Sequence, residues 1–104
     1  MEINIKNFGI SGIYVKAEGR LDLDSAVEYG TKIKDAVEDA EETVTEVVLD
    51  FSEITFISSF GLKVILEIYK DLKAQNGTVK IKNISEQIKS SFTMVGFDKF
   101  ITFE

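Results

Sequence analysis

The sequence predicts an α/β fold in one domain covering residues 1–104, with a mixed, mostly parallel β-sheet, an N-terminal hairpin and flanking helices. Two segments that alternate apolar and polar residues come first, separated by a short glycine-containing stretch. Short apolar runs then alternate with stretches whose apolar residues recur at helical spacing. This gives the order β-β-α-β-α-β-α-β, which is typical of parallel strands joined by helical crossovers. The length, 104 residues, fits a single domain.

The first half of the chain predicts a hairpin followed by a helix. Residues 2–8 and 13–17 alternate as half-buried strands, and Gly9 and Gly12 bracket the turn between them. The run 19–22 ends the second strand, and Asp22 or Asp24 can cap the next helix. That helix is expected to reach about residue 41, with its apolar face made by Ala26, Tyr29, Ile33, Ala36, Val37 and Ala40.

The second half predicts strands and helices in alternation. Residues 46–51 form a nearly continuous apolar run, which favours a strand covered on both sides, and 54–57 read as a brief extended segment. An amphipathic helix follows and ends at Asn76-Gly77; its apolar positions are Leu62, Ile65, Leu66, Tyr69 and Leu72. Residues 79–82 alternate as a strand, and 100–103 can form a terminal edge strand. Between them Ser85 is expected to cap the last helix, whose stripe is Ile88, Phe92 and Val95.

The composition narrows the chemistry that the chain can perform. It contains no cysteine and no histidine, so thiol nucleophiles, thiolate metal sites and the commonest general base are absent. The formal net charge of −6 disfavours nucleic acid and anionic lipid as partners. No apolar run is long enough to span a membrane, and the N-terminus lacks the features of a signal peptide. We therefore expect a cytoplasmic protein.

Two adjacent hydroxyls, Ser58 and Ser59, lie where a predicted strand passes into a predicted helix. A serine there can cap the helix, a contribution of about 1 kcal/mol. It can also accept a phosphate, because the start of a helix stabilises an anion. The two interpretations are compatible, since one serine can cap while the other is phosphorylated.

Enzyme chemistry has little support in the sequence. Serine hydrolysis needs a base next to the serine, and neither a histidine nor a Ser-x-x-Lys spacing supplies one. The glycines fit no phosphate-binding loop, and no cofactor is expected. Asp22, Asp24 and Asp50 could gather near the turn as a metal-dependent hydrolase site, although caps and solvated loop residues explain them as well.

Several segments together resemble a known family. They are Gly19-Arg20-Leu21-Asp22, the run 47–51, the stretch from Ile54 to Leu62, Asn76-Gly77 before a strand, and the closing segment from Ile88 to Phe100. In this order they resemble the bacterial anti-sigma-factor antagonists, the STAS domains, over nearly the whole chain. The resemblance implies the STAS-type fold.

The resemblance also implies a function. Members of this family bind a serine-kinase anti-sigma factor when unphosphorylated and so release a sigma factor. The kinase switches the domain off by phosphorylating one serine, and a phosphatase of the PP2C type resets it. No nucleic acid or membrane partner is implied. With Gly61-Leu62 aligned to the family's Asp-Ser-Ser/Thr-Gly-Leu motif, the implied acceptor is Ser59, with Ser58 as the alternative.

The chain departs from that motif at two positions. Ser58 stands in place of the aspartate, and Phe60 in place of a small residue. Phe60 either packs inward or forms an exposed anchor for the partner. The resemblance implies that Asp22, Ser58, Phe60 and Gly61 contribute to partner binding, although Asp22 serves equally well as a cap. The alternative function is a constitutive STAS subunit of a signalling scaffold or a transporter, in which the serines only cap.

Overall fold

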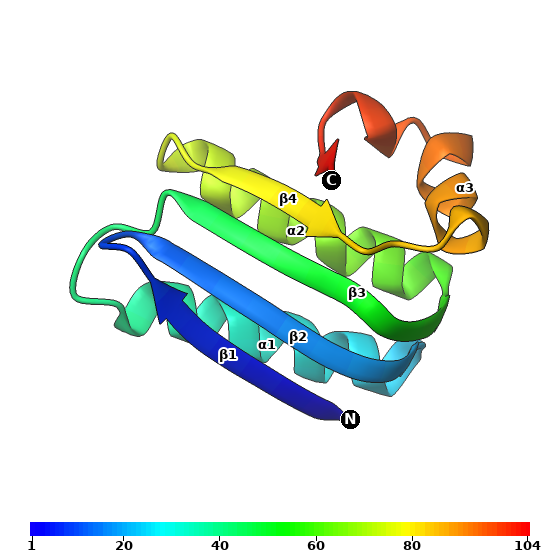
Figure 1. Ribbon diagram of the computed structural model, residues 1–104, viewed down its shortest axis with the longest axis horizontal. Coiled ribbons are helices and arrows are strands. Elements are labelled where there is room, and N and C mark those ends of the chain that lie inside the picture. The colour runs from blue at the N-terminus through cyan, green and yellow to red at the C-terminus, as the bar shows by residue number, and fades with distance from the viewer.

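The computed structural model describes residues 1–104 and contains a five-stranded sheet, three α-helices and one short 3₁₀ helix (Figure 1). The strands are β1 (Glu2–Phe8), β2 (Gly12–Leu21), β3 (Glu46–Ile57), β4 (Thr78–Lys82) and β5 (Thr102–Phe103). The helices are α1 (Leu23–Asp39), α2 (Ser59–Ala74), α3 (Glu86–Met94) and η1 (Phe97–Lys99). The sheet order is β1-β2-β3-β4-β5, with β1 antiparallel to β2 and every other pair parallel. The predicted fold class and order of elements are confirmed.

The helices leave one face of the sheet open. Right-handed crossovers between strands that follow each other across the sheet place the connecting helices on the same side. Figure 1 looks onto the other side, with α1 and α2 lying behind the strands. No helix layer therefore covers the second face of residues 46–51, although residues 47–51 are all buried, as a strand covered on both sides would be. Val47 and Leu49 point into the core, whereas Val48 and Asp50 alternate to the open face.

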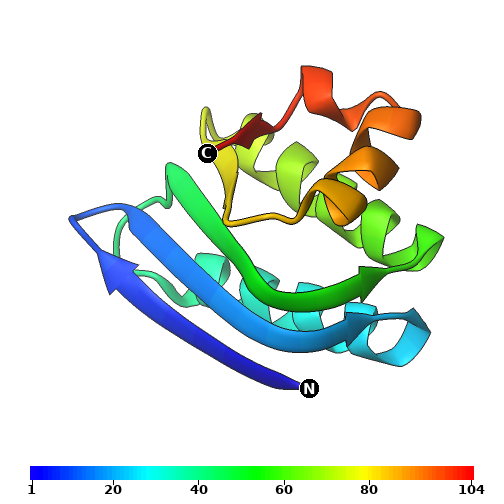
Figure 2. The same cartoon turned by 45° about the vertical axis from the view of Figure 1, so that its right-hand side comes forward.

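Strand β3 is one continuous strand, so residues 54–57 are not the separate segment that the sequence suggested. Against β2 its register shifts between Lys16 and Glu18 and again between Gly19 and Arg20. Each shift places one extra residue in β3, and such bulges bend a strand. Figure 2 shows β2 and β3 bending together toward the end where the helices begin.

The end of α2 was predicted correctly. Asn76 adopts a left-handed conformation with φ 60°, and the N–H of Gly77 donates to the carbonyl of Leu72 at 2.6 Å. The N–H of Asn76 donates to the carbonyl of Lys73 at 3.1 Å. These bonds satisfy carbonyls that the helix itself leaves unpaired. None of the helices is both long and apolar enough to cross a bilayer.

The C-terminal segment agrees with the sequence in part. The hydroxyl of Ser85 accepts from the N–H of Ile88 at 3.2 Å, which confirms this cap. Phe92 is buried against the aromatic ring of Phe51, with a centroid distance of 6.1 Å. Val95 was wrongly assigned to the buried stripe, because α3 ends at Met94 and leaves it exposed. The last strand is shorter than expected and excludes residues 100 and 101.

Candidate functional site

The site lies at the edge of the sheet where β2 passes into α1 and β3 passes into α2. Leu21 and Ile57, the last residues of the two strands, are paired in register. The carbonyl of Leu21 accepts from the N–H of Ser58 at 2.9 Å and lies 3.0 Å from its hydroxyl. The two strand-to-helix turns are therefore tied to each other by direct hydrogen bonds.

Ser58 is the residue that caps α2. Its hydroxyl accepts from the N–H of Gly61 at 3.2 Å and donates to the carbonyl of Leu21 at 3.0 Å. Its backbone is extended, as the position before a helix requires. This partly buried hydroxyl therefore donates one hydrogen bond and accepts another within the fold.

Ser59 differs from its neighbour in each of these respects. It is the first residue of α2, it is exposed, and its hydroxyl makes no hydrogen bond within the protein. The first turn of a helix has free N–H groups and the positive end of the helix dipole. An anion attached to this hydroxyl would lie next to groups that stabilise it.

Phe60 and Gly61 follow with opposite exposure. Phe60 is 50% exposed, so it does not pack fully inward and half of its surface is available at the start of α2. Gly61 is buried, and a Cβ there would lie 2.6 Å from Cγ1 of Ile57 and 2.9 Å from the carbonyl oxygen of Leu21. Only glycine fits this approach, so Gly61 lets α2 begin close against the end of β2.

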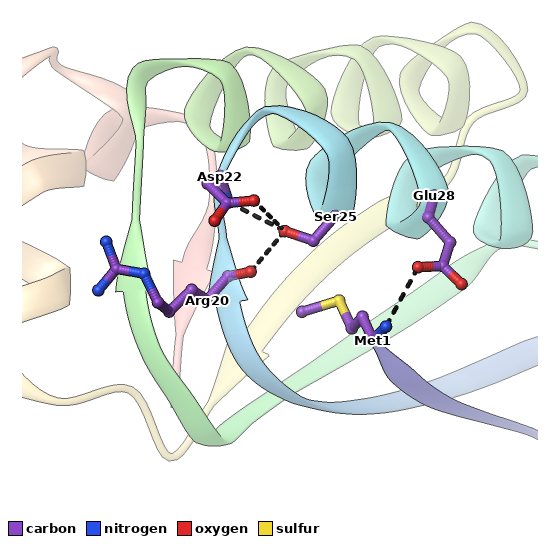
Figure 3. Close-up of polar contacts among 5 residues, drawn as sticks. All are labelled: Met1, Arg20, Asp22, Ser25 and Glu28. Atoms are coloured by element: carbon purple, nitrogen blue, oxygen red, sulfur yellow. Dashed lines mark hydrogen bonds and ion pairs between the residues drawn. The ribbon is translucent and has the colours of Figure 1, made fainter.

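Asp22 caps α1, which decides between the two aspartates that the sequence left open. The hydroxyl of Ser25 accepts from the N–H of Asp22 at 3.0 Å and lies 2.9 Å from its carboxylate (Figure 3). The same hydroxyl lies 2.5 Å from the carbonyl of Arg20. Asp24 lies in the first turn of α1 instead. Asp22 is exposed, so it can also contact a partner.

The three aspartates do not form a metal site. Asp22 and Asp24 lie at the start of α1, whereas Asp50 is buried in the middle of β3, opposite Lys16 and Lys82 in the neighbouring strands. No group of three acidic side chains in the protein is close enough to hold one ion. The arrangement gives no support to the hydrolase alternative.

Sequence reasoning missed the apolar surface near the serines. Leu23 and Val27, on the first turns of α1, are 51% and 58% exposed. Val27 and Val64 line a groove between α1 and α2. Val64 follows Phe60 by four residues, about one turn further along α2. The signal was present in the sequence, because Leu23 and Val27 are four residues apart and fall outside the buried stripe of α1.

Arg20 and Phe56 complete this edge of the sheet. They are paired in register, and the guanidinium of Arg20 lies 4.1 Å from the centre of the Phe56 ring. Such a contact is a favourable cation–π interaction. It holds an exposed cation next to the turn that carries Ser58 and Ser59.

Comparisons with known proteins agree with this architecture. The chain matches the STAS domain family over residues 6–104. It is similar to SpoIIAA, the Bacillus cell fate determinant, in its phosphorylated form, with 20% identity, a TM-score of 0.76, and coverage of 99% of this chain and 91% of that chain. It is similar to an anti-sigma factor antagonist from Mycobacterium paratuberculosis, with 21% identity, a TM-score of 0.79, and coverage of 98% of this chain and 85% of that chain.

A transporter also contains this fold. The murine anion transporter Slc26a9 is 13% identical, with a TM-score of 0.77 over 94% of this chain and 17% of the transporter. The TM-scores of these structures establish a shared fold, and at such low sequence identity they establish nothing further. The match to the family covers most of the chain. The chain therefore belongs to the STAS domain family.

Proposed function

We propose that this protein is an anti-sigma-factor antagonist whose docking to a serine-kinase anti-sigma factor is controlled by phosphorylation of Ser59. The main support for the proposal is that the hydroxyls of the two serines differ in their hydrogen bonding and exposure. The hydroxyl of Ser58 is used by the cap, whereas that of Ser59 is exposed and unbonded. This favours Ser59 over Ser58 as the acceptor. The protein acts as a binding module in the cytoplasm and catalyses nothing itself.

The surroundings of Ser59 suit a protein partner. Phe60, Leu23 and Val27 expose apolar surface on the first turns of two adjacent helices. Exposed apolar surface surrounded by polar residues is typical of protein interfaces. Asp22 lies at the same edge and supplies a charged contact at the rim.

Phosphorylation would change this surface without unfolding the domain. A phosphate adds a charge of about −1.5 to −2. At the start of α2 the fold stabilises that charge, but a partner that covers the apolar surface would have to bury it. The unphosphorylated protein therefore binds the kinase, the phosphorylated protein is released, and a phosphatase of the PP2C type restores binding.

The proposal is tested with the candidate kinase, ATP and magnesium, followed by intact mass spectrometry. We expect one added phosphate on the wild type and on Ser58→Ala, and none on Ser59→Ala. Phosphate that persists in Ser59→Ala contradicts the assignment of the acceptor. A complete absence of phosphate with every kinase that binds the protein contradicts the switch.

Docking is tested separately by measuring affinity for the same kinase. Ser59→Asp should keep the fold and weaken binding, and Phe60→Ala should weaken binding by about tenfold or more, because its half-exposed ring lies next to Ser59. Phe100→Ala is the matched control, because Phe100 is 54% exposed but lies in the C-terminal segment, after η1. Equal losses from the two phenylalanine variants contradict the proposed surface.

A constitutive STAS subunit is the second candidate, favoured by the structural similarity to the domain within a transporter. In that case Ser58 only caps α2, and the hydroxyl of Ser59 has no regulatory role. A pull-down that recovers a transporter component but no kinase, together with unchanged binding of Ser59→Asp, would support it.

A further inference from the structure

The polar centre of the open sheet face is satisfied within the chain. The hydroxyl of Tyr14 donates to the carboxylate of Asp50 at 2.5 Å. That carboxylate also accepts from the N–H of Ser52 at 2.9 Å and from the side-chain amide of Asn83 at 3.2 Å. Burial alone would raise the pKa of Asp50, but these hydrogen bonds lower it to about 2. The groups of this sheet that lack partners lie instead at its edge.

Strand β1 is an uncovered edge of the sheet. It pairs with β2 on one side only, and Figure 1 shows no element beyond its other side. The outward N–H and C=O groups of an edge strand are a template for another strand. Short length, a proline or a bulge often protects such an edge. β1 has seven residues, no proline and no register shift against β2, whereas the opposite edge strand β5 has only two residues.

The two charged residues of β1 have no partner of opposite charge. Glu2 lies directly opposite Glu18 on β2, and like charges in that position are unfavourable. Lys6 lies opposite Tyr14. Both side chains are exposed, and neither takes part in an ion pair of the protein. A strand that pairs with β1 would gain from supplying a cation near Glu2 and a carboxylate near Lys6.

A second copy of β1 supplies both. A two-fold axis perpendicular to the sheet makes the two strands antiparallel and keeps the helices of both copies on the same side. With that axis at Asn4, Glu2 of each copy lies opposite Lys6 of the other. We propose that β1 pairs with β1 of a second copy about Asn4, which joins the two sheets into one continuous sheet.

The same register also covers apolar surface. Ile3 and Ile5 lie opposite Ala17 and Val15, so they point to the helix side of the sheet. They pack against the core but are only partly buried, because no strand flanks them on the outside. In the pair, Ile3 of one copy lies opposite Ile5 of the other. Cross-strand contacts between β-branched side chains are favourable.

The neighbouring registers lose the charge pairing. The axis can move only in steps that keep side chains of the same face opposite one another. An axis at Ile5 places Glu2 opposite Phe8, and an axis at Lys6 places the two lysines opposite each other. An axis at Ile3 leaves Lys6 opposite no residue. The charges of β1 therefore select the register centred on Asn4.

This dimer would leave the serine turn accessible. Ser59 follows β3, which is separated from β1 by β2. The inference therefore stands apart from the proposed phosphorylation, and each dimer would carry two serine turns. The contact runs along one strand of each copy, and such a small interface belongs to the weak, reversible class.

The experiment follows self-association of the full chain from micromolar to millimolar concentration. Sedimentation equilibrium should show the mass rising from that of a monomer toward that of a dimer. Amide shifts of a ¹⁵N-labelled sample should change with concentration at residues 2–7, and Ser59→Asp should behave as the wild type does. A chain that stays monomeric at millimolar concentration overturns the proposal and leaves the edge to a strand of another protein. Shift changes centred on other elements also overturn it.

Charge variants test the register. Lys6→Glu and Glu2→Lys each place like charges opposite each other at both ends of the pair, so each alone should self-associate at least about tenfold more weakly. An equimolar mixture of the two should recover association, because each variant supplies the charge that the other lacks.

Matched variants on α2 separate this pairing from a general charge effect. Lys63→Glu and Glu67→Lys make the same charge changes, also four residues apart, at exposed positions of that helix. Each should self-associate as the wild type does, and mixing them should add nothing. The proposal is overturned if the α2 variants lose as much association as the β1 variants, or if mixing the β1 variants gives no recovery.

Discussion

Replacing the two adjacent serines one at a time should separate stability from phosphorylation. Ser58→Ala should lower stability and keep phosphorylation, and Ser59→Ala should keep stability and abolish phosphorylation. Ser58→Ala removes the acceptor for the N–H of Gly61 and the donor to the carbonyl of Leu21. Loss of a serine cap costs about 1 kcal/mol, and loss of a further hydrogen bond about 1 kcal/mol more. The carbonyl of Leu21 keeps its bond from the N–H of residue 58, so it is not left unpaired.

The expected cost of Ser58→Ala is therefore about 2 kcal/mol of unfolding free energy, or a fall in Tm of about 10 °C for a domain of this size. Ser59→Ala breaks no hydrogen bond and should stay within about 0.5 kcal/mol of the wild type. Urea unfolding followed by circular dichroism measures both, and the slope m should not change.

The same two proteins are then treated with the kinase. Ser58→Ala should still gain phosphate despite its lower stability, and Ser59→Ala should not despite its intact fold. The reasoning is refuted if Ser59→Ala is destabilised as much as Ser58→Ala, because the cap would then have been assigned to the wrong hydroxyl.

The remaining predictions concern packing and pH. Gly61→Ala should destabilise the protein by about 1–3 kcal/mol, although alanine favours helices, because its methyl group would lie 2.6 Å from Cγ1 of Ile57; a more stable variant in urea unfolding contradicts this. Between about pH 4 and 2 the protein should lose about 2 kcal/mol of stability as the pH falls. The reason is that the folded state lowers the pKa of Asp50 from 3.8 to about 2, so the unfolded state binds more protons there. Tyr14→Phe removes a hydrogen bond to that carboxylate, so it should raise the pKa of Asp50 and shrink the loss; superimposable stability–pH profiles of wild type and variant contradict the assignment.

The order of strands and helices could be predicted because local patterns carry it. The alternation in residues 2–8 and the helical spacing of Ala26, Tyr29 and Ile33 each indicate one kind of element. The serine turn could be located for the same reason, since a strand pattern ends and a helix pattern begins there. These features depend on neighbours in the sequence.

The features that could not be predicted depend on how distant segments meet. Ser58 caps because α2 begins at the next residue, and its hydroxyl also bonds to the carbonyl of Leu21, a contact that the register of β2 against β3 fixes. Asp50 stands within an apolar run, and its bond to Tyr14 follows only from the same register. The open face of the sheet follows from the strand order, which an isolated apolar strand does not reveal.

The agreement between strand order in the chain and strand order across the sheet bears on how the protein folds. Each parallel pairing joins strands that follow each other in the chain, with one helix between them, or α3 and η1 between β4 and β5, so each closing loop is short and its entropic cost is small. The units β2-α1-β3 and β3-α2-β4 share strand β3, so the formation of either unit can nucleate the folding of the other. The chain has no proline, and slow isomerisation of that residue cannot delay refolding. Refolding after a denaturant jump should therefore follow a single exponential, with the edge strands β1 and β5 joining after the centre has formed.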